Sequence, residues 1–260
     1  MKMDKRKVVI KVGTSTLTYD TGKINIRRIE HLSRVISDLK HSGCEVVLVS
    51  SGAVGVGMSK LGFSKKPDTV QGKQAASAVG QSELMSMYGK FFAEYGCQVA
   101  QILITKEVLE DDTRRTNAQN AFQMLSDWDV VPIVNENDVI STAEIEFGDN
   151  DTLSAVVAEL ISADMLIILS DIDGLYDKNP TIFHDAVLIP EVTEVTEKLM
   201  EIAGDSGSNR GTGGMITKLI AAKKAMNAGV DMIITNGERP EVIYDILEDR
   251  AVGTRFVAKK

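Results

Sequence analysis

The chain has 260 residues, of which 43% are hydrophobic and 25% charged, a composition typical of globular proteins. Its formal net charge of -8 argues against nucleic acid as the main partner, which would call for a basic face. No apolar run approaches the ~18 residues of a membrane span, and the N-terminus lacks the apolar core of a secretory signal. Two cysteines, Cys44 and Cys97, are too few for a disulfide framework or a zinc site. We therefore expect reduced thiols in a cytoplasmic protein without a membrane partner.

Short apolar runs alternate with longer stretches of helical periodicity. In chain order, this pattern predicts a strand at 8–10, a helix at 26–39, a strand at 46–49 that runs into a turn and a helix start, a helix at 71–95, strands at 99–104 and 130–134, a helix at 153–161, a strand at 165–169, a helix at 215–226, a strand at 232–234 and a short helix at 242–247. Residues 135–147 break the rhythm and are predicted to be extended and hairpin-like. Apolar strands that alternate with helices indicate a mostly parallel sheet covered on both faces. We expect one domain over residues 1–260, with two lobes and a ligand at the carboxyl ends of the strands.

The usual nucleotide-binding signatures are absent. The sequence has no Walker A loop, and the two Gly-x-Gly turns at 55–57 and 211–213 lack the third glycine of the dinucleotide fingerprint. The protein-kinase motifs are also missing. The histidines His31, His41 and His184 are scattered along the chain and are predicted to be structural or on the surface.

Polar clusters follow the first two predicted strands. Lys11 closes a strand ahead of Gly13, an arrangement that suits phosphate because glycine lets the backbone approach and the ammonium neutralises charge. Ser51 and Gly52 begin a small-residue turn into a helix, where backbone N–H groups suit an anion. The simpler interpretations remain open: Lys11 as a lysine that extends into water, and residues 50–57 as a tight strand–helix connection.

Two further pairs of motifs stand out. Asn-Glu-Asn-Asp at 135–138 and Gly-Asp-Asn-Asp at 148–151 concentrate acids and amides, and a helix N-cap alone does not need so many. Such groups suit a metal ion, or an α-amino group and carboxylate. Ser-Asp-Ile-Asp-Gly at 170–174 is paired with Gly-Thr-Gly-Gly at 211–214, each of which is also consistent with a simple turn. Lys218 borders the apolar stripe of its predicted helix, which is a poor place for an ordinary solvated lysine.

Taken together, these residues resemble the amino acid kinase family, and within it the kinases that act on the side-chain carboxylate of L-glutamate. The resemblance covers essentially the whole chain and rests on the motifs at 11–15, 51–53, 74–81, 135–138, 148–151 and 211–215 with Lys218. The pair at 135–138 and 148–151 is the specific part, because related kinases vary there. One departure is plain: many such kinases continue into a C-terminal PUA domain, and this chain stops at Lys260.

The resemblance implies a three-layer αβα sandwich with an amino acid site in the N-terminal lobe and a nucleotide site in the C-terminal lobe. It implies transfer of a phosphoryl group from ATP to L-glutamate, giving L-glutamyl 5-phosphate in the first step of proline biosynthesis. Mg²⁺ would be bridged by the ATP phosphates, with no metal ligand assigned to the protein. Proline is expected as a feedback inhibitor, and a homo-oligomer, dimer or tetramer, is expected.

The resemblance also assigns roles to residues. Catalysis falls to Lys11, Lys218 and Asp151. L-Glutamate would be held by Ser51, Gly52, Asn135, Asp138, Asp149 and Asn150. The nucleotide would be held by Lys11, Gly13, Ser170, Asp171, Thr212, Gly213, Gly214, Met215, Ile216, Thr217 and Lys218.

Two alternatives remain. One is another kinase of the same family, acting on acetylglutamate or aspartate. The other is a non-catalytic amino acid sensor on the same scaffold. Retention of both lysines argues against a sensor, and the two acid-and-amide motifs favour a free amino acid as substrate.

Overall fold

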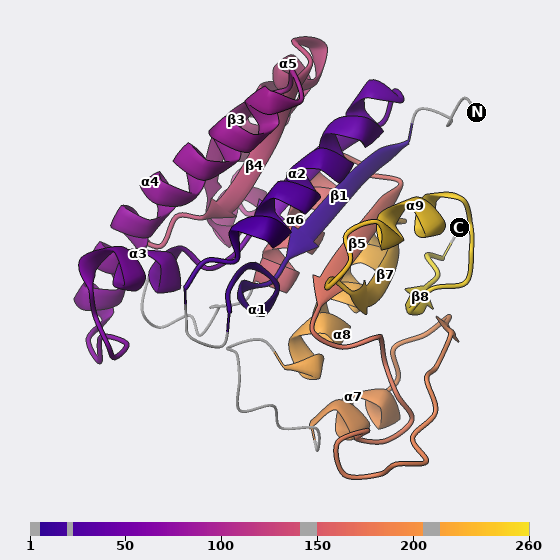
Figure 1. The fold of residues 1–260 in the computed structure, drawn as a ribbon. Coiled ribbons are helices and arrows are strands. Elements are labelled where there is room, and N and C mark those ends of the chain that lie inside the picture. The colour runs from indigo at the N-terminus through magenta and orange to yellow at the C-terminus, as the bar shows by residue number, and fades with distance from the viewer. Residues whose placement is uncertain (1–5, 20–22, 141–149, 205–213, 260) are drawn as a thin grey trace.

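The computed structural model describes residues 6–19, 23–140, 150–204 and 214–259. Its centre is one eight-stranded sheet in the order β3-β4-β2-β1-β5-β7-β8-β6 (Figure 1). Neighbouring strands pair in parallel except β7 and β8, which are antiparallel. The mainly parallel sheet expected from the sequence is therefore confirmed. The strands are β1 (Lys7–Val12), β2 (Glu45–Ser50), β3 (Gln98–Ile104), β4 (Val130–Glu136), β5 (Met165–Ser170), β6 (Glu191–Val192), β7 (Asp231–Asn236) and β8 (Thr254–Phe256).

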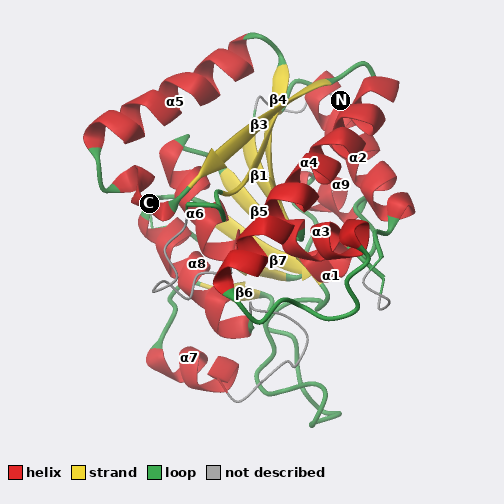
Figure 2. Ribbon diagram, turned by 90° about the vertical axis from the view of Figure 1, so that its left-hand side faces the viewer, coloured by secondary structure: helices red, strands yellow, loops and turns green. Residues whose placement is uncertain are grey.

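Helices cover both faces of the sheet (Figures 1 and 2). On one face, strand side chains such as Ile10, Leu48 and Ile167 pack in one buried cluster with residues of α2 (Ile26–His41), α4 (Val70–Glu94) and α9 (Val242–Leu247). On the other, Val9, Val49 and their neighbours pack with α6 (Asn150–Leu160) and α8 (Met215–Asn227). Two cores separated by a sheet make the three-layer αβα sandwich.

Helix starts follow local sequence signals. The side chain of Asn25 accepts a hydrogen bond from the backbone N–H of Arg28 at the start of α2. Thr69 does the same for α4, and Asp111 for α5 (Asp112–Asp127). Each cap satisfies one of the backbone donors that a helix leaves unpaired at its first turn. The remaining helices are α1 (Thr14–Leu17), α3 (Ala53–Leu61), α7 (Glu197–Gly204) and the 3₁₀ turn η1 (Lys106–Leu109).

Two glycines bring α3 and α4 into backbone contact. A Cβ atom on Gly57 would lie 1.8 Å from the carbonyl oxygen of Ala76, and one on Gly80 would lie 1.8 Å from that of Ala53. No side chain fits between the helices there, so glycine is required at both positions. The contact fixes the start of α3, with the preceding Ser51, against the middle of α4.

The chain order of the strands places a crevice above β1. The strands β2, β3 and β4 follow β1 in the chain and lie on one side of it in the sheet. The next strand, β5, lies on the other side of β1. Such a switch leaves an opening at the carboxyl ends of the central strands, where ligands bind in open α/β sheets. Lys11, Ser51 and Ser170 all lie at that edge.

The predicted strands and helices are all present, most with ends shifted by one to three residues. The polar helix α5 and the short elements α7, β6 and β8 were not predicted. Of the segment expected to be hairpin-like, Asn135 and Glu136 belong to β4 and residues 138–140 form a turn; residues 141–147 lie outside the described part. Within the described residues, no helix is both long and apolar enough to span a membrane.

Candidate active site

A buried carboxylate joins two lysines at the carboxyl edge of the sheet. Asp151, the second residue of α6, has no exposed surface, and Lys11 and Lys218 are each 6% exposed. The Nζ atom of Lys11 lies 2.5 Å from Oδ1 of Asp151, and that of Lys218 lies 3.1 Å from Oδ2. The hydroxyl of Thr217 lies 3.3 Å from the same Oδ2. We call Lys11, Asp151 and Lys218 the lysine cluster.

The lysine cluster is stable only as an ionised set. Burial alone would raise the pKa of Asp151, but the charges of Lys11 and Lys218, with their hydrogen bonds, lower it to about 2. Two cations and one anion leave a formal charge of +1 in a site with little access to water. Such a site attracts an anion and strengthens its electrostatic stabilisation, as phosphoryl transfer requires.

A second cluster lies beside the first, because Asn150 precedes Asp151 on α6. The side-chain amide of Asn150 donates to the carbonyl of Ser50 at 2.9 Å, to the hydroxyl of Ser51 at 3.0 Å and to Oδ1 of Asn135 at 2.9 Å. Asn135 in turn donates to Oε1 of Gln81 at 2.8 Å. We call Ser51, Gln81, Asn135 and Asn150 the amide cluster; it joins the ends of β2 and β4 to α4 and α6.

Asp138 lies next to α4, where the hydroxyl of Ser77 donates to its carboxylate. Burial raises the pKa of Asp138, and the hydrogen bond from Ser77 opposes that rise. Ser77 and Gln81 were not predicted as site residues. Their spacing of four places both on one face of α4, and that helical spacing is the signal that points to them.

Two glycines let the loops after β1 and β2 approach each other. Gly52 has φ of +95°, a left-handed conformation that side chains other than glycine rarely adopt, and a Cβ there would lie 3.4 Å from Thr14. A Cβ on Gly13 would lie 3.7 Å from Nζ of Lys11. Gly13 therefore adjoins the lysine cluster, and Gly52 adjoins the loop that follows β1.

The structure describes some of the residues that the sequence predicts to bind the nucleotide. Thr217 donates to the carbonyl of Gly214 at the start of α8, which also carries Lys218. Ser170 is buried at the end of β5 and donates to the exposed Asp171. Met215 is half-buried and Ile216 is 39% exposed. Asp149, Thr212 and Gly213 lie outside the described residues.

In the part of the chain that the structure describes, no three His, Cys, Asp or Glu side chains are grouped to hold a metal ion. The donor set at the site consists of ammonium, amide and hydroxyl groups with two carboxylates, Asp138 and Asp151. The lysines occupy both oxygens of Asp151. This set fits an anion such as the phosphates of a nucleotide.

Comparison with known proteins identifies the family. The model of the "Amino acid kinase family" matches residues 6–236. The chain belongs to the amino acid kinase family. The glutamate 5-kinase of Clostridium perfringens is 56% identical over 261 residues, which cover 99% of this chain and 97% of that protein. The glutamate 5-kinase of Listeria innocua is 50% identical, with 98% and 94% covered.

Solved structures of the amino acid kinase family share the fold. A carbamate kinase from Giardia lamblia bound to AMP-PNP superposes with a TM-score of 0.67 at 20% identity, covering 98% of this chain and 99% of that one. An isopentenyl phosphate kinase in a substrate complex gives 0.68 at 22% identity, with 96% and 99% covered. The αβα sandwich of this chain is therefore that of the family.

Proposed function

We propose that the chain transfers a phosphoryl group from ATP to the side-chain carboxylate of L-glutamate, giving ADP and L-glutamyl 5-phosphate. The observation that carries this proposal is the pair of neighbours on α6. Asn150 organises the amide cluster and Asp151 organises the lysine cluster, so the two sets of groups lie side by side. Relatives at 50–56% identity over nearly the whole chain are named for this activity.

The lysine cluster serves the transferred group. When bound, ATP would supply the phosphoryl group, and an accompanying Mg²⁺ would neutralise phosphate charge. Lys11 and Lys218 stabilise the charge that develops on the transferred oxygens, and Asp151 holds both ammonium groups in place. Phosphoryl transfer depends on such positioning and charge stabilisation and needs no protein nucleophile. The backbone N–H groups of Gly13 and Gly52 would bind phosphate oxygens.

The amide cluster serves L-glutamate. Ser51, Asn135 and Asn150 offer hydroxyl and amide groups for the α-carboxylate, and the carboxylate of Asp138 offers a partner for the α-ammonium. The side-chain carboxylate then extends toward the lysine cluster. In this assignment the N-terminal half of the chain and α6 hold the amino acid. The nucleotide lies over Ser170, Asp171 and the start of α8, and Thr212 and Gly213 remain predicted nucleotide residues. Asp149 remains a predicted residue of the glutamate site.

The test is turnover in two single variants. Lys11→Ala and Lys218→Ala should each lower kcat by ~10²–10³, the loss typical of removing one charge-stabilising donor. Each variant keeps one ion pair to Asp151, so the buried carboxylate stays partnered. Turnover is measured by trapping the acyl phosphate with hydroxylamine, with circular dichroism to verify folding and Lys60→Ala, an exposed pair with Glu83, as the control. Near-normal turnover in a folded variant would remove these roles.

The same assay separates substrates. A panel of glutamate, acetylglutamate and aspartate, each with ATP, should give hydroxamate with glutamate alone at a high rate. Efficient use of another carboxylate would favour a different kinase of the family. Glutamate binding without any ATP consumption would favour a sensor.

We further propose proline as an inhibitor that overlaps the glutamate site. Proline carries an α-carboxylate and an ammonium that match the partners of the amide cluster and Asp138, but it has no side-chain carboxylate to phosphorylate. Inhibition by proline should therefore weaken as glutamate rises. Titrating proline at several glutamate concentrations tests this; inhibition independent of glutamate would exclude overlap. The homo-oligomer and the cytoplasmic location stay predictions from the sequence.

A further inference from the structure

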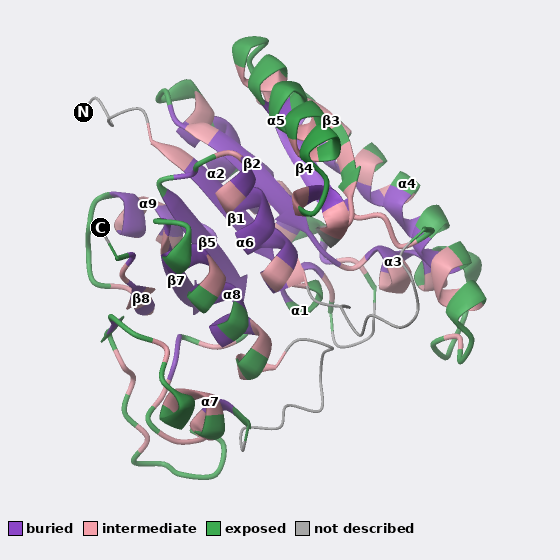
Figure 3. Ribbon diagram, turned by 180° about the vertical axis from the view of Figure 1, so that it is seen from behind, coloured by how far each residue is buried: buried purple, intermediate pink, exposed green. Residues whose placement is uncertain are grey.

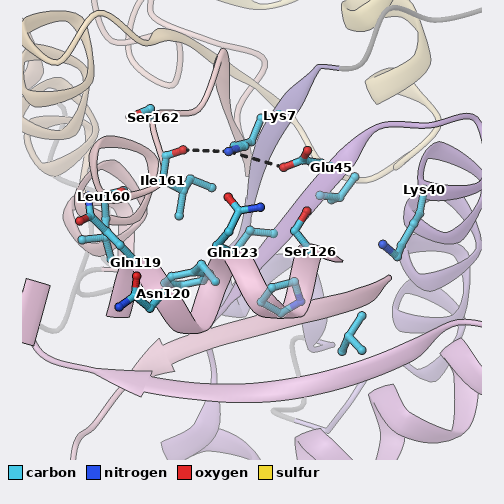
Figure 4. A pocket seen from close by; sticks show the side chains of 15 residues that line it. Lys7, Lys40, Glu45, Gln119, Asn120, Gln123, Ser126, Leu160, Ile161 and Ser162 are labelled. Carbon is cyan, nitrogen blue, oxygen red and sulfur yellow. Dashed lines mark hydrogen bonds and ion pairs between the residues drawn. The ribbon is translucent and has the colours of Figure 1, made fainter. Parts of the chain in front are cut away.

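A second cavity lies at the opposite edge of the sheet, under α5 (Figure 4). Its volume is about 410 Å³, within the range of small-molecule sites. Lys7 at the start of β1 and Glu45 at the start of β2 line it, as does Leu160 at the end of α6. Asp151 lies at the other end of α6, about 14 Å away at 1.5 Å per residue. The cavity is therefore separate from the candidate active site.

The cavity exists because α5 covers the sheet with a polar face. Gln119, Asn120, Gln123 and Ser126 of α5 line it, and of the sixteen residues in this helix only Phe122 is buried. A helix that covers a sheet ordinarily presents an apolar stripe several residues wide. Figure 3 shows α5 largely exposed, in contrast to the buried α6 on the same face. Amide side chains at this position leave space and hydrogen-bonding groups facing it.

The floor of the cavity is apolar. Val47, Pro132 and Phe122 line it, and all three are buried. A ligand there would remove apolar surface from water while its polar groups reach the amides of α5. The lining is thus suited to a molecule with an apolar body and a polar end.

The charged residues around the cavity determine whether it favours an anionic or a cationic group on the ligand. The charged residues among those that line it are Lys7, Lys40 and Glu45, a formal charge of +1. Lys7 lies 3.5 Å from Glu45 and donates to the carbonyl of Ile161. The side chain of Lys40 is only 7% exposed and its ammonium lies 2.8 Å from Asp129, whose side chain is 84% exposed. Asp129 lies largely in water, which screens its charge, whereas the side chain of Lys40 is largely buried.

We propose that this cavity, bounded by α5, the starts of β1 and β2 and the end of α6, is a binding site for a small organic anion with an apolar body. The anionic group binds the ammonium of Lys40, which has three N–H donors and also forms an ion pair with Asp129. The apolar body lies on Val47, Phe122 and Pro132. The inference does not depend on the proposed kinase activity, since it uses none of the residues of the active site.

The chain carries its own reporter. Trp128, the single tryptophan, immediately follows α5 and precedes Asp129. Trp128 is 66% exposed and adjoins Asp129, the ion-pair partner of Lys40, so a ligand that draws Lys40 away from Asp129 should change its emission. Hexanoate is a suitable probe, because it has the expected chemistry and does not absorb where tryptophan is excited. Hexanamide has the same apolar chain without the charge.

The experiment titrates both probes against Trp128 fluorescence in the full chain. Hexanoate should give a saturable change, and hexanamide should bind about tenfold or more weakly, the factor expected for losing one charge-assisted hydrogen bond. Inorganic phosphate, which lacks the apolar body, should also bind weakly. Trp128→Phe should abolish the signal. Equal binding of hexanamide, or no saturable change with hexanoate, would overturn the proposal.

Two variants locate the site. Lys40→Met keeps the apolar stem, leaves no buried carboxylate without a partner and should weaken hexanoate binding about tenfold. Lys60→Met removes an exposed ion pair on α3, away from the cavity, and should leave binding unchanged. Gln123→Phe keeps both lysines but fills the cavity, and it should also lose hexanoate. Glutamate-dependent turnover should stay normal in all three, which verifies folding. Unchanged hexanoate affinity in Lys40→Met and Gln123→Phe would place the probe elsewhere and reject this site.

Discussion

Asp151 illustrates how one residue can hold a site together. It is the buried anion between two buried cations, and neither lysine would be stable at its position without it. Asn150, its neighbour, has the corresponding role among the amides. A helix that begins with these two residues therefore sets the positions of groups from β1, β2, β4 and α8.

Replacing Asp151 with Asn should destabilise the protein by ~3–5 kcal/mol at pH 7, because two buried ammonium groups lose their counter-ion. The pKa of Asp151 is lowered to about 2, so its ionisation contributes stability above the unfolded pKa of 3.8, and this contribution is lost as pH falls toward 2. Unfolding in denaturant at a series of pH values should show a constant difference between wild type and variant from pH 8 to 5. The difference should shrink below about pH 4; no change there would contradict the ionised cluster.

The charge of Asp138 should affect stability in the direction opposite to that of Asp151. Burial raises its pKa, so its charge costs stability at neutral pH, and Asp138→Asn should leave the protein as stable as wild type or more so. The same variant should raise KM for glutamate by roughly tenfold to a hundredfold, with little change in KM for ATP. In wild type, acidification should raise KM for glutamate as Asp138 becomes protonated. Because its pKa is raised, this rise should begin at a higher pH than it would for an aspartate of ordinary pKa. That dependence should vanish in Asp138→Asn, and a larger effect on ATP would reverse the substrate assignment.

At the scale of elements, the crossing of α3 and α4 depends on backbone contact. Gly55 and Gly57 look equivalent in the sequence Gly-Val-Gly, yet a Cβ on Gly57 would strike the carbonyl of Ala76, whereas one on Gly55 has nothing within 4 Å. The pattern alone does not distinguish them. The helix α5 was not predicted for a similar reason. It has too few apolar residues to show a helical period, and only the capping residue Asp111 indicates where it starts.

Gly57→Ala should destabilise the protein by ~1–3 kcal/mol, the usual cost of overpacking, and raise KM for glutamate because Ser51 moves. Gly55→Ala should stabilise by ~0.5–1 kcal/mol, since alanine is the better helix former. Denaturant unfolding of the two variants side by side is the measurement. Equal effects of the two variants on the free energy of unfolding would show that α3 and α4 can move apart without loss of stability.

At the scale of the whole molecule, the apolar runs were enough to predict a mostly parallel sheet covered on both faces, because buried parallel strands are apolar throughout. The motifs at strand ends pointed to the carboxyl edge, where the structure places Lys11, Ser51 and Ser170. The order of strands was not predictable, since it depends on crossovers between distant segments. The short strands β6 and β8 were missed because two or three residues show no period. Ser77 and Gln81 join the site only through tertiary packing of α4.

The contact between Gly57 and Gly80 also limits how the substrate pocket changes shape. Because no side chain separates α3 from α4, their backbones are in direct contact, and we expect Ser51 and Gln81 to keep their separation when a substrate binds. On the other boundary, Asn135 lies one residue before the end of β4 and Asp138 follows that strand. In the proposed assignment, the side built on α3 and α4 then acts as a fixed gauge of substrate length.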